Sequence, residues 1–176
     1  MSNKKQPNRQ SFNDLWGRPG FLIRRLHQIH VGMFLEECTE FNVTPAQFAV
    51  LTVLYYQGTL DQISIASQIG FDRNTVADVI RRLEHRGLLD RPASISDKRP
   101  KLARITDEGR EFVDAVQPAM IKAQRRLVSP LSAEEYETLM KLMDKLLLEN
   151  NEASRAPLRT KSKRSSQYEA AKTTTD

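Results

Sequence analysis

The stretch that decides the fold spans residues 61–109 and reads DQISIASQIGFDRNTVADVIRRLEHRGLLDRPASISDKRPKLARITDEG. Apolar residues recur at helical spacing over about 61–69, and Gly70 can end that helix because glycine accepts the left-handed conformation. Asp72 can cap a second helix over about 73–86 by accepting bonds from backbone N–H groups. The pattern therefore predicts two short helices joined by a tight turn.

The second helix has two unlike faces. Its apolar residues fall on one side, and they are Val76, Val79, Ile80 and Leu83. The polar residues that could meet a partner are Arg73, Asn74, Thr75, Asp78, Arg81 and Arg82. A helix fits the DNA major groove, where Arg and Asn pair bidentately with guanine and adenine, and the positive helix start suits phosphate. A merely solvated polar face is the alternative, and the helix alone leaves it open.

A basic hairpin follows the two helices. Short strand candidates at 88–91 and 102–106 enclose a turn-rich loop over 92–101. Three cations crowd the tip of this loop, namely Lys98, Arg99 and Lys101. An Arg on such a loop can enter the narrow minor groove, and Asp97 could hold its guanidinium by a bidentate pair. Two helices and a basic hairpin make a winged helix-turn-helix, which favours the DNA interpretation.

This region resembles the MarR (multiple antibiotic resistance regulator) family, and the resemblance extends over about residues 20–149. Asp97-x-Arg99, followed by Leu102, Ile105-Thr106 and Gly109, is similar to the wing of that family. The runs DRNTV at 72–76 and RRLE-x-x-GL at 81–88 are similar to its recognition helix and the exit from it. The resemblance implies a dimeric repressor or activator, mainly α-helical with a small β-hairpin wing, that releases DNA when a small ligand binds.

The composition fits one cytoplasmic globular domain. The chain has 176 residues, 39% of them hydrophobic and 28% charged, with a single Cys that leaves no intrachain disulfide. There is no apolar run of membrane-spanning length and no signal-peptide core. The formal net charge of +5 is carried by the ends, because residues 1–20 and 150–176 each hold +3. The body is therefore near neutrality, so a DNA-binding face must be a local cationic patch.

The ends and the body have different expected structures. We expect a disordered arm over 1–18 and a disordered basic tail over 150–176, because neither holds enough apolar residues to offset the entropy of ordering. The run 159–164 (RTKSKR) could touch flanking phosphates, although a solvated tail is the simpler interpretation. The body, 19–149, divides into a DNA-binding unit at about 44–106 and helices at 19–41 and 107–149.

The outer helices carry more apolar surface than one chain needs. A helix from Pro19 to about residue 41 has two adjoining apolar stripes, and a helix from Pro45 to about 57, capped by Thr44, is apolar nearly all round. Thr106 or Asp107 can cap a helix to about 128, with a possible disturbance at Pro118, and Ser132 can cap the last helix. The surplus predicts a homodimer. A twofold dimer would read a palindromic operator whose half-sites lie about one helical turn apart.

A ligand site is implied by a further resemblance. The segment RPGFLIRRLHQIH at 18–30 is similar to the first helix of MarR-type regulators of hydroxybenzoate, hydroxycinnamate and nicotinate degradation. In those regulators the ligand lies between the dimerisation helices and the winged unit. The resemblance places these residues near it: Arg24 or Arg25, His27, His30, Phe34, Phe48 and Tyr55. Arg can clamp a carboxylate, and no cofactor other than a small aromatic acid effector is expected. The alternative is that each residue is an ordinary core or surface group.

Other functions leave weaker traces. His27 and His30 could form half of a zinc site, but Cys38 lies too far along the helix to join both. Redox sensing through Cys38 is disfavoured, since the neighbouring Glu36, Glu37 and Glu40 would raise the thiol pKa. No enzyme motif is present, so we expect no catalytic activity. A helical protein-interaction module without DNA binding is the remaining alternative, and a salt-dependent gel shift of a palindromic duplex would separate the two.

Overall fold

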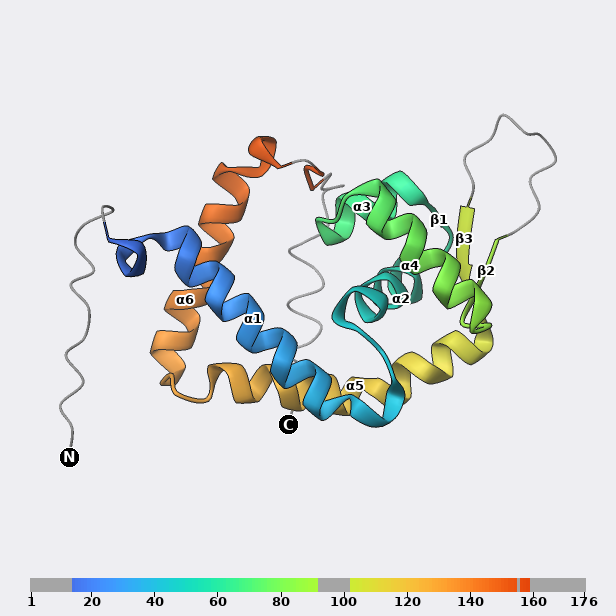
Figure 1. Ribbon diagram of the computed structural model, residues 1–176, viewed down its shortest axis with the longest axis horizontal. Helices are drawn as coiled ribbons and strands as arrows, with labels where there is room; N and C mark the ends of the chain where they lie inside the picture. The colour runs from blue at the N-terminus through green and yellow to red at the C-terminus, as the bar shows by residue number, and fades with distance from the viewer. Residues whose placement is uncertain (1–13, 92–101, 155, 159–176) are drawn as a thin grey trace. The chain divides into compact units, whose positions relative to one another are not determined.

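The computed structural model describes residues 14–91, 102–154 and 156–158, and these residues are mainly α-helical (Figure 1). The elements follow in the order η1 Leu15–Gly17, α1 Pro19–Glu37, η2 Thr39–Phe41, α2 Pro45–Gln57, β1 Leu60–Asp61, α3 Gln62–Ile69, α4 Arg73–His85, β2 Leu89–Asp90, β3 Leu102–Ile105, α5 Asp107–Val128, α6 Ala133–Glu149 and η3 Asn151–Ala153. The fold class expected from the sequence, mainly helical with a small β wing, is confirmed. Within the described ranges, no helix has the length and apolar character needed to cross a membrane.

The chain divides into two compact units by the density of its contacts. One unit comprises residues 1–45 and 114–137, and the other comprises 46–113 and 138–176. The second unit contains α3, α4 and all three described strands. Its core is aliphatic, with Leu51, Leu54, Ile65, Val76 and Leu83 fully buried. Burial of such side chains contributes about 1.5–3 kcal/mol each, so this core fixes the position of the two helices.

The sheet has one strand more than the sequence pattern indicates. Its order is β1-β3-β2, and both pairings are antiparallel. Leu60 pairs with Ala103 on one side of β3, and Leu89 pairs with Ile105 on the other. The expected hairpin is therefore present, while β1 was missed because two residues are too few to show an alternating pattern.

The end of α1 differs from the end expected from the sequence, whereas the end of α5 agrees with it. The first helix was expected to continue to about residue 41, but α1 ends at Glu37. The chain then tightens into η2, and Asn42 takes a left-handed conformation with φ 48°. Asn tolerates this conformation better than most residues, so it ends the helical path. In contrast, α5 ends at Val128 as expected, and Pro118 does not interrupt it.

Large apolar side chains remain exposed on two helices. On α1 they include Ile23, Leu26 and Ile29, and on α6 they include Leu142, Met143, Leu146, Leu147 and Leu148. Six of these eight side chains are more than half exposed, as Ile23 at 61% and Leu147 at 61% illustrate. A single chain therefore leaves substantial apolar surface uncovered on α1 and on α6.

Candidate nucleic-acid interface

The start of α4 is built by Asp72. Its carboxylate accepts hydrogen bonds from the backbone N–H groups of Asn74 and Thr75, both at 3.0 Å, and from the Thr75 hydroxyl at 2.6 Å. These bonds, that from the Thr75 hydroxyl first, lower the pKa of the Asp72 carboxyl. The capped helix start presents Arg73 and Asn74 to solvent. The expected cap is confirmed, and it already engages the hydroxyl of Thr75.

The two faces of α4 separate as the periodicity indicates. Val76, Ile80 and Leu83 are buried, and Val79 is half-buried. The polar residues expected to meet DNA are exposed apart from the half-buried Thr75, and they are Arg73, Asn74, Asp78, Arg81 and Arg82. This face can therefore meet a partner without disturbing the core.

Ion pairing distinguishes the cations of α4. Arg81 pairs with Asp78 at 2.7 Å, and both side chains are more than half exposed. Within the described ranges, Arg73 and Arg82 pair with no carboxylate. An exposed pair of this kind contributes little to stability, so Arg81 can exchange Asp78 for a phosphate at small cost. Arg73 and Arg82 need no such exchange.

The helix-turn-helix is held together by groups that the sequence pattern only partly revealed. Asp61 caps α3 through the backbone N–H groups of Ile63 and Ser64, both at 2.9 Å, and Gly70 closes it with φ 69°. The amide of Gln62 donates to the carbonyl oxygen of Arg73 at 2.7 Å. That bond links the first residue of α3 to the first residue of α4, and its role could not be inferred from local spacing.

The base of the wing is held by a cross-strand ion pair. Asp90 on β2 lies opposite Arg104 on β3. The Arg104 guanidinium donates two hydrogen bonds to the Asp90 carboxylate, at 3.1 and 2.6 Å. Hydrogen bonding to Arg104 lowers the pKa of the Asp90 carboxyl. This pair aligns the two strands, and sequence analysis missed it because the two residues are 14 positions apart.

The tip of the wing lies outside the described residues. This concerns the cations expected to enter the minor groove, Lys98, Arg99 and Lys101, together with Asp97. The strands that lead to them are described, and their antiparallel pairing agrees with a hairpin across 92–101.

The first unit contains the histidines of the expected ligand set. The His27 and His30 rings lie 6.4 Å apart, and His30 meets Phe34 edge to face at the same centroid distance. The Gln124 amide of α5 lies 2.8 Å from Nε2 of His30. Burial, and then the charge of His27, lowers the pKa of His30. His30 therefore stays neutral near pH 7 and can exchange hydrogen bonds with an uncharged polar group.

The other residues of the expected ligand set have varied environments. Arg24 and Arg25 are both exposed on α1, whereas Phe34 of the same unit is fully buried. In the second unit, Phe48 is a buried core residue, and the Tyr55 ring lies 5.3 Å from the Arg110 guanidinium. Phe34 and Phe48 therefore have the burial of ordinary core residues, the alternative that the sequence leaves open.

An ion-paired, half-buried carboxylate on α1 was missed by sequence reasoning. The Glu37 side chain is 11% exposed and pairs with Lys122 and Arg126 of α5, while Glu36 also pairs with Arg126 at 3.0 Å. Hydrogen bonds from Lys122 and Arg126 lower the pKa of Glu37. These pairs fasten α1 to α5 inside the first unit. Their spacing of 85 to 90 residues leaves no local signal in the sequence.

The alternatives that involve Cys38 gain no support. Cys38 is 1% exposed, and burial, followed by the charge of Glu37, raises the pKa of its thiol. A raised pKa suppresses the reactive thiolate, as the acidic neighbours had indicated. Among the described residues there is no group of three or more His, Cys, Asp or Glu side chains that could hold a metal ion.

Two capped helices, an exposed polar helix face and an aligned strand pair define a winged helix-turn-helix, the DNA-binding unit of a class of transcriptional regulators. The MarR family model matches residues 43–101. An uncharacterised HTH-type transcriptional regulator of Bacillus subtilis, YkoM, is 33% identical over 111 residues, which cover 63% of this chain and 72% of the relative. The chain therefore belongs to the MarR family, and it is a DNA-binding transcriptional regulator rather than an enzyme.

Two further relatives are informative. The transcriptional repressor NicR of Pseudomonas putida is 24% identical over 151 residues, which cover 84% of this chain and 96% of NicR. The solved structure of Bordetella bronchiseptica BpsR, described as regulated in DNA binding by 6-hydroxynicotinic acid, is 31% identical. It matches with a TM-score of 0.69 over 72% of this chain and 96% of BpsR.

Proposed function

We propose that this protein is a ligand-responsive repressor. It binds a palindromic operator as a homodimer and is released by a small aromatic carboxylic acid. The observation that carries the proposal is the exposed polar face of α4, which starts at a capped helix end and stands beside an aligned wing base. The likeness to NicR, a repressor, and to BpsR, regulated by 6-hydroxynicotinic acid, supports the regulatory part.

DNA reading divides between α4 and the wing. Asn74 and Arg73 at the helix start are suited to base edges and phosphate, and Arg82 and Arg81 are suited to the backbone further along. Thr75, whose hydroxyl is engaged by Asp72, offers its methyl group and a hydroxyl lone pair. Arg99 enters the minor groove, with Lys98 and Lys101 on the flanking phosphates.

The homodimer would cover the apolar residues exposed on α1 and α6. Sedimentation at micromolar concentration should give about twice the chain mass of 20.2 kDa. Ile23→Glu with Leu26→Glu should give a folded monomer that binds a palindrome weakly, because both side chains are exposed in the single chain. A wild-type monomer with high affinity for a palindrome would contradict the symmetric arrangement.

The effector is proposed to be a flat ring with a carboxylate and one more polar group, and a hydroxynicotinate is the first choice. Arg24 or Arg25 would clamp the carboxylate, and His30, with His27 beside it, would bond the second polar group. The lowered pKa of His30 suits this role, since a neutral imidazole can either donate or accept. A ligand that favours the DNA-incompetent state must lower DNA affinity by linkage.

The DNA part is tested by substitution at the two reading elements. The duplex is a palindrome selected by the protein from a random library. Arg99→Ala should weaken binding by about 1–3 kcal/mol, and Arg73→Ala should also weaken it. Asn74→Ala should change the preferred sequence, whereas Arg125→Ala, on the exposed part of α5, serves as the control. Unchanged binding of both Arg99→Ala and Arg73→Ala would contradict the docking.

The effector part is tested by thermal shift across aromatic carboxylic acids, followed by DNA release. An acid at about 100 times its Kd should stabilise the protein by about 2.7 kcal/mol. Either Arg24→Ala or Arg25→Ala should abolish the response and spare DNA binding, because both lie on α1, outside the DNA-reading elements. If Zn²⁺ shifts the melting temperature and no aromatic acid does, the effector proposal is wrong while the DNA proposal stands.

A further inference from the structure

His85 is the last residue of α4, and the DNA reading described above leaves it without a role. Its side chain is exposed. It follows Asn74, Asp78 and Arg81 at helical spacings of eleven, seven and four residues, which return to the same side of a helix. His85 therefore belongs to the DNA-facing side of α4, opposite the buried residues.

The length of α4 brings its last turn to the edge of the major groove. The helix has 13 residues, and the eleven steps from Asn74 to His85 span about 16 Å at the usual rise per residue. The major groove of DNA is about 12 Å wide. With Asn74 at the base edges, His85 lies at the row of phosphates that borders the groove.

The carboxylates of α4 near its end are already engaged by arginines. Glu84, the neighbour of His85, pairs with Arg91 at 3.0 Å. Asp78, on the same side of the helix as His85, pairs with Arg81 at 2.7 Å. An imidazolium at the end of α4 would therefore have to compete with an arginine for either carboxylate.

The elements packed against α4 offer no further carboxylate. The helix contacts α3 and β2, and α3 has no ionisable side chain over Gln62–Ile69. Asp90 of β2 is bound by Arg104 at 2.6 Å, and the contact from α5 is the Phe112 ring under the Arg86 guanidinium, at 5.0 Å. Among the described residues, His85 thus pairs with no carboxylate, and a DNA phosphate would be an anion free to bind it.

A phosphate at this end of α4 depends on cationic side chains. The end of a helix carries the negative pole of its dipole, which disfavours an anion. The basic residues of the last turn are Arg82 and His85. An arginine stays charged at all relevant pH values, whereas histidine is the side chain whose charge changes between about pH 5 and 8.

We propose that His85 is a proton-dependent phosphate contact, which makes the DNA affinity of this protein rise as pH falls from 8 to 6. The imidazole takes up a proton from solvent when the duplex binds, and its N–H then donates to a phosphate oxygen. Each protonated copy neutralises one more phosphate and releases condensed counterions. The proposal rests on the docking of α4 described under the proposed function and adds a regulation by pH to it.

The experiment measures Kd at pH 8 and pH 6, at fixed ionic strength and without effector, for the selected palindrome and for a mixed-sequence duplex. Wild-type protein should bind both duplexes roughly three- to tenfold more tightly at pH 6, because each exposed charge contact is modest and a homodimer has two. The salt slope should be steeper at pH 6 by up to about 1.8, or about 0.9 for each copy. Calorimetry in two buffers of different ionisation enthalpy should record the uptake of protons on binding.

Two substitutions separate the charge of His85 from any structural role. His85→Gln keeps a hydrogen-bond donor but cannot take up a proton, so its affinity should be nearly independent of pH and its salt slope should not change. His85→Lys is charged throughout, so it should bind at pH 8 as tightly as the wild type does at pH 6. Glu111→Gln, at an exposed position of α5, is the control and should keep the wild-type pH profile. Thermal melts at both pH values would verify that every variant is folded.

Three outcomes would overturn the proposal. One is wild-type binding without proton uptake. Another is a pH profile that persists in His85→Gln, which would assign it to other titrating groups, first the two remaining histidines, His27 and His30 of α1. The third is a His85→Lys protein that binds no more tightly than His85→Gln, because then no phosphate lies within reach. An error in the docking of α4 itself would instead appear as unchanged binding of Arg73→Ala.

Discussion

Gly109, the third residue of α5, lies directly against the backbone of Leu88 and the side chain of Ile105 at the base of the wing. A Cβ atom placed there would lie 2.0 Å from the carbonyl oxygen of Leu88 and 2.7 Å from Cγ1 of Ile105. Ordinary contact begins at 3.4 Å, so the start of α5 or the backbone at Leu88 would have to shift by about 1.4 Å. Gly109→Ala should therefore destabilise the second unit.

The expected loss of stability in Gly109→Ala combines two destabilising contributions and one stabilising contribution. Overpacking costs about 1–3 kcal/mol, and more when backbone must move. The shift also strains Thr106, whose hydroxyl donates to the Gly87 carbonyl at 2.7 Å and accepts from the Gly109 N–H at 3.0 Å. A lost hydrogen bond costs about 1 kcal/mol, whereas the better helix propensity of Ala returns up to about 1 kcal/mol. We expect a net loss of about 2–4 kcal/mol.

The assay is thermal unfolding at one fixed protein concentration, because a dimer's melting temperature depends on concentration. For a chain of this length each kcal/mol corresponds to about 2–4 °C, so the melting temperature should fall by at least roughly 4 °C. Gly32→Ala is the control, since its Cβ would meet nothing within 4 Å and the substitution should stabilise α1 by about 0.5–1 kcal/mol. A Gly109→Ala protein that melts at or above the wild-type temperature would refute the packing argument.

Three further results are expected. Burial raises the pKa of the Asp61 carboxyl, but hydrogen bonds from donors at the start of α3 lower it by more, so the net pKa is lowered. The stabilisation by Asp61 is therefore present above its pKa in the unfolded chain and is lost as pH falls through its pKa in the folded protein. Asp61→Asn should keep the cap of α3 but make the stability less dependent on pH between about pH 5 and 3. Urea unfolding should show wild-type stability falling below about pH 6.5, because burial and His27 lower the pKa of His30; His30→Gln should reduce that fall, and an identical pH dependence would contradict it. Arg104→Met should raise the pKa of Asp90, measured by carboxyl NMR titration, and weaken DNA binding through the loosened wing.

Local chemistry made the helix-turn-helix predictable. Asp61 and Asp72 act on backbone N–H groups two and three residues ahead, and Gly70 ends α3 within the same turn. Gly87 closes α4 in the same manner, with φ 73° and the Leu88 N–H bonded back to the Leu83 carbonyl. Each of these signals is complete within a few residues, so a sequence pattern contains all the necessary information.

Long-range pairing was beyond the reach of the sequence. The strand β1 exists because Leu60 meets Ala103, and the link between α1 and α5 exists because Glu37 meets Lys122 and Arg126. Composition shows that the net charge of the body is near zero. It does not show which cationic side chains are paired with carboxylates in the folded protein. Arg104 and Arg126 are bound by carboxylates, whereas Arg73 and Arg82 on the DNA-facing helix pair with no carboxylate of the described residues.

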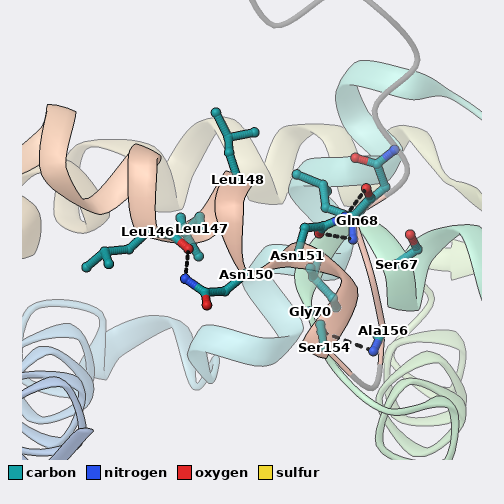
Figure 2. Close-up of a pocket in the computed structure, with 12 residues that line it drawn as sticks. Ser67, Gln68, Gly70, Leu146, Leu147, Leu148, Asn150, Asn151, Ser154 and Ala156 are labelled. Atoms are coloured by element: carbon teal, nitrogen blue, oxygen red, sulfur yellow. Dashed lines mark hydrogen bonds between the residues drawn. The ribbon is translucent and has the colours of Figure 1, made fainter. Parts of the chain in front are cut away.

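The described part of 151–158 shows what average composition leaves out. Residues 150–176 were expected to be disordered because they hold few apolar side chains, and the described part of 151–158 is bonded to specific polar partners. The bonds join polar groups: Asn151 satisfies both backbone groups of Leu158 (Figure 2), and the Pro157 carbonyl accepts from Ser67, 90 residues away. Average composition cannot register such bonds, because they depend on two specific partners. A short polar segment can thus be held in place without a core of its own, provided that a folded neighbour supplies the matching donors and acceptors.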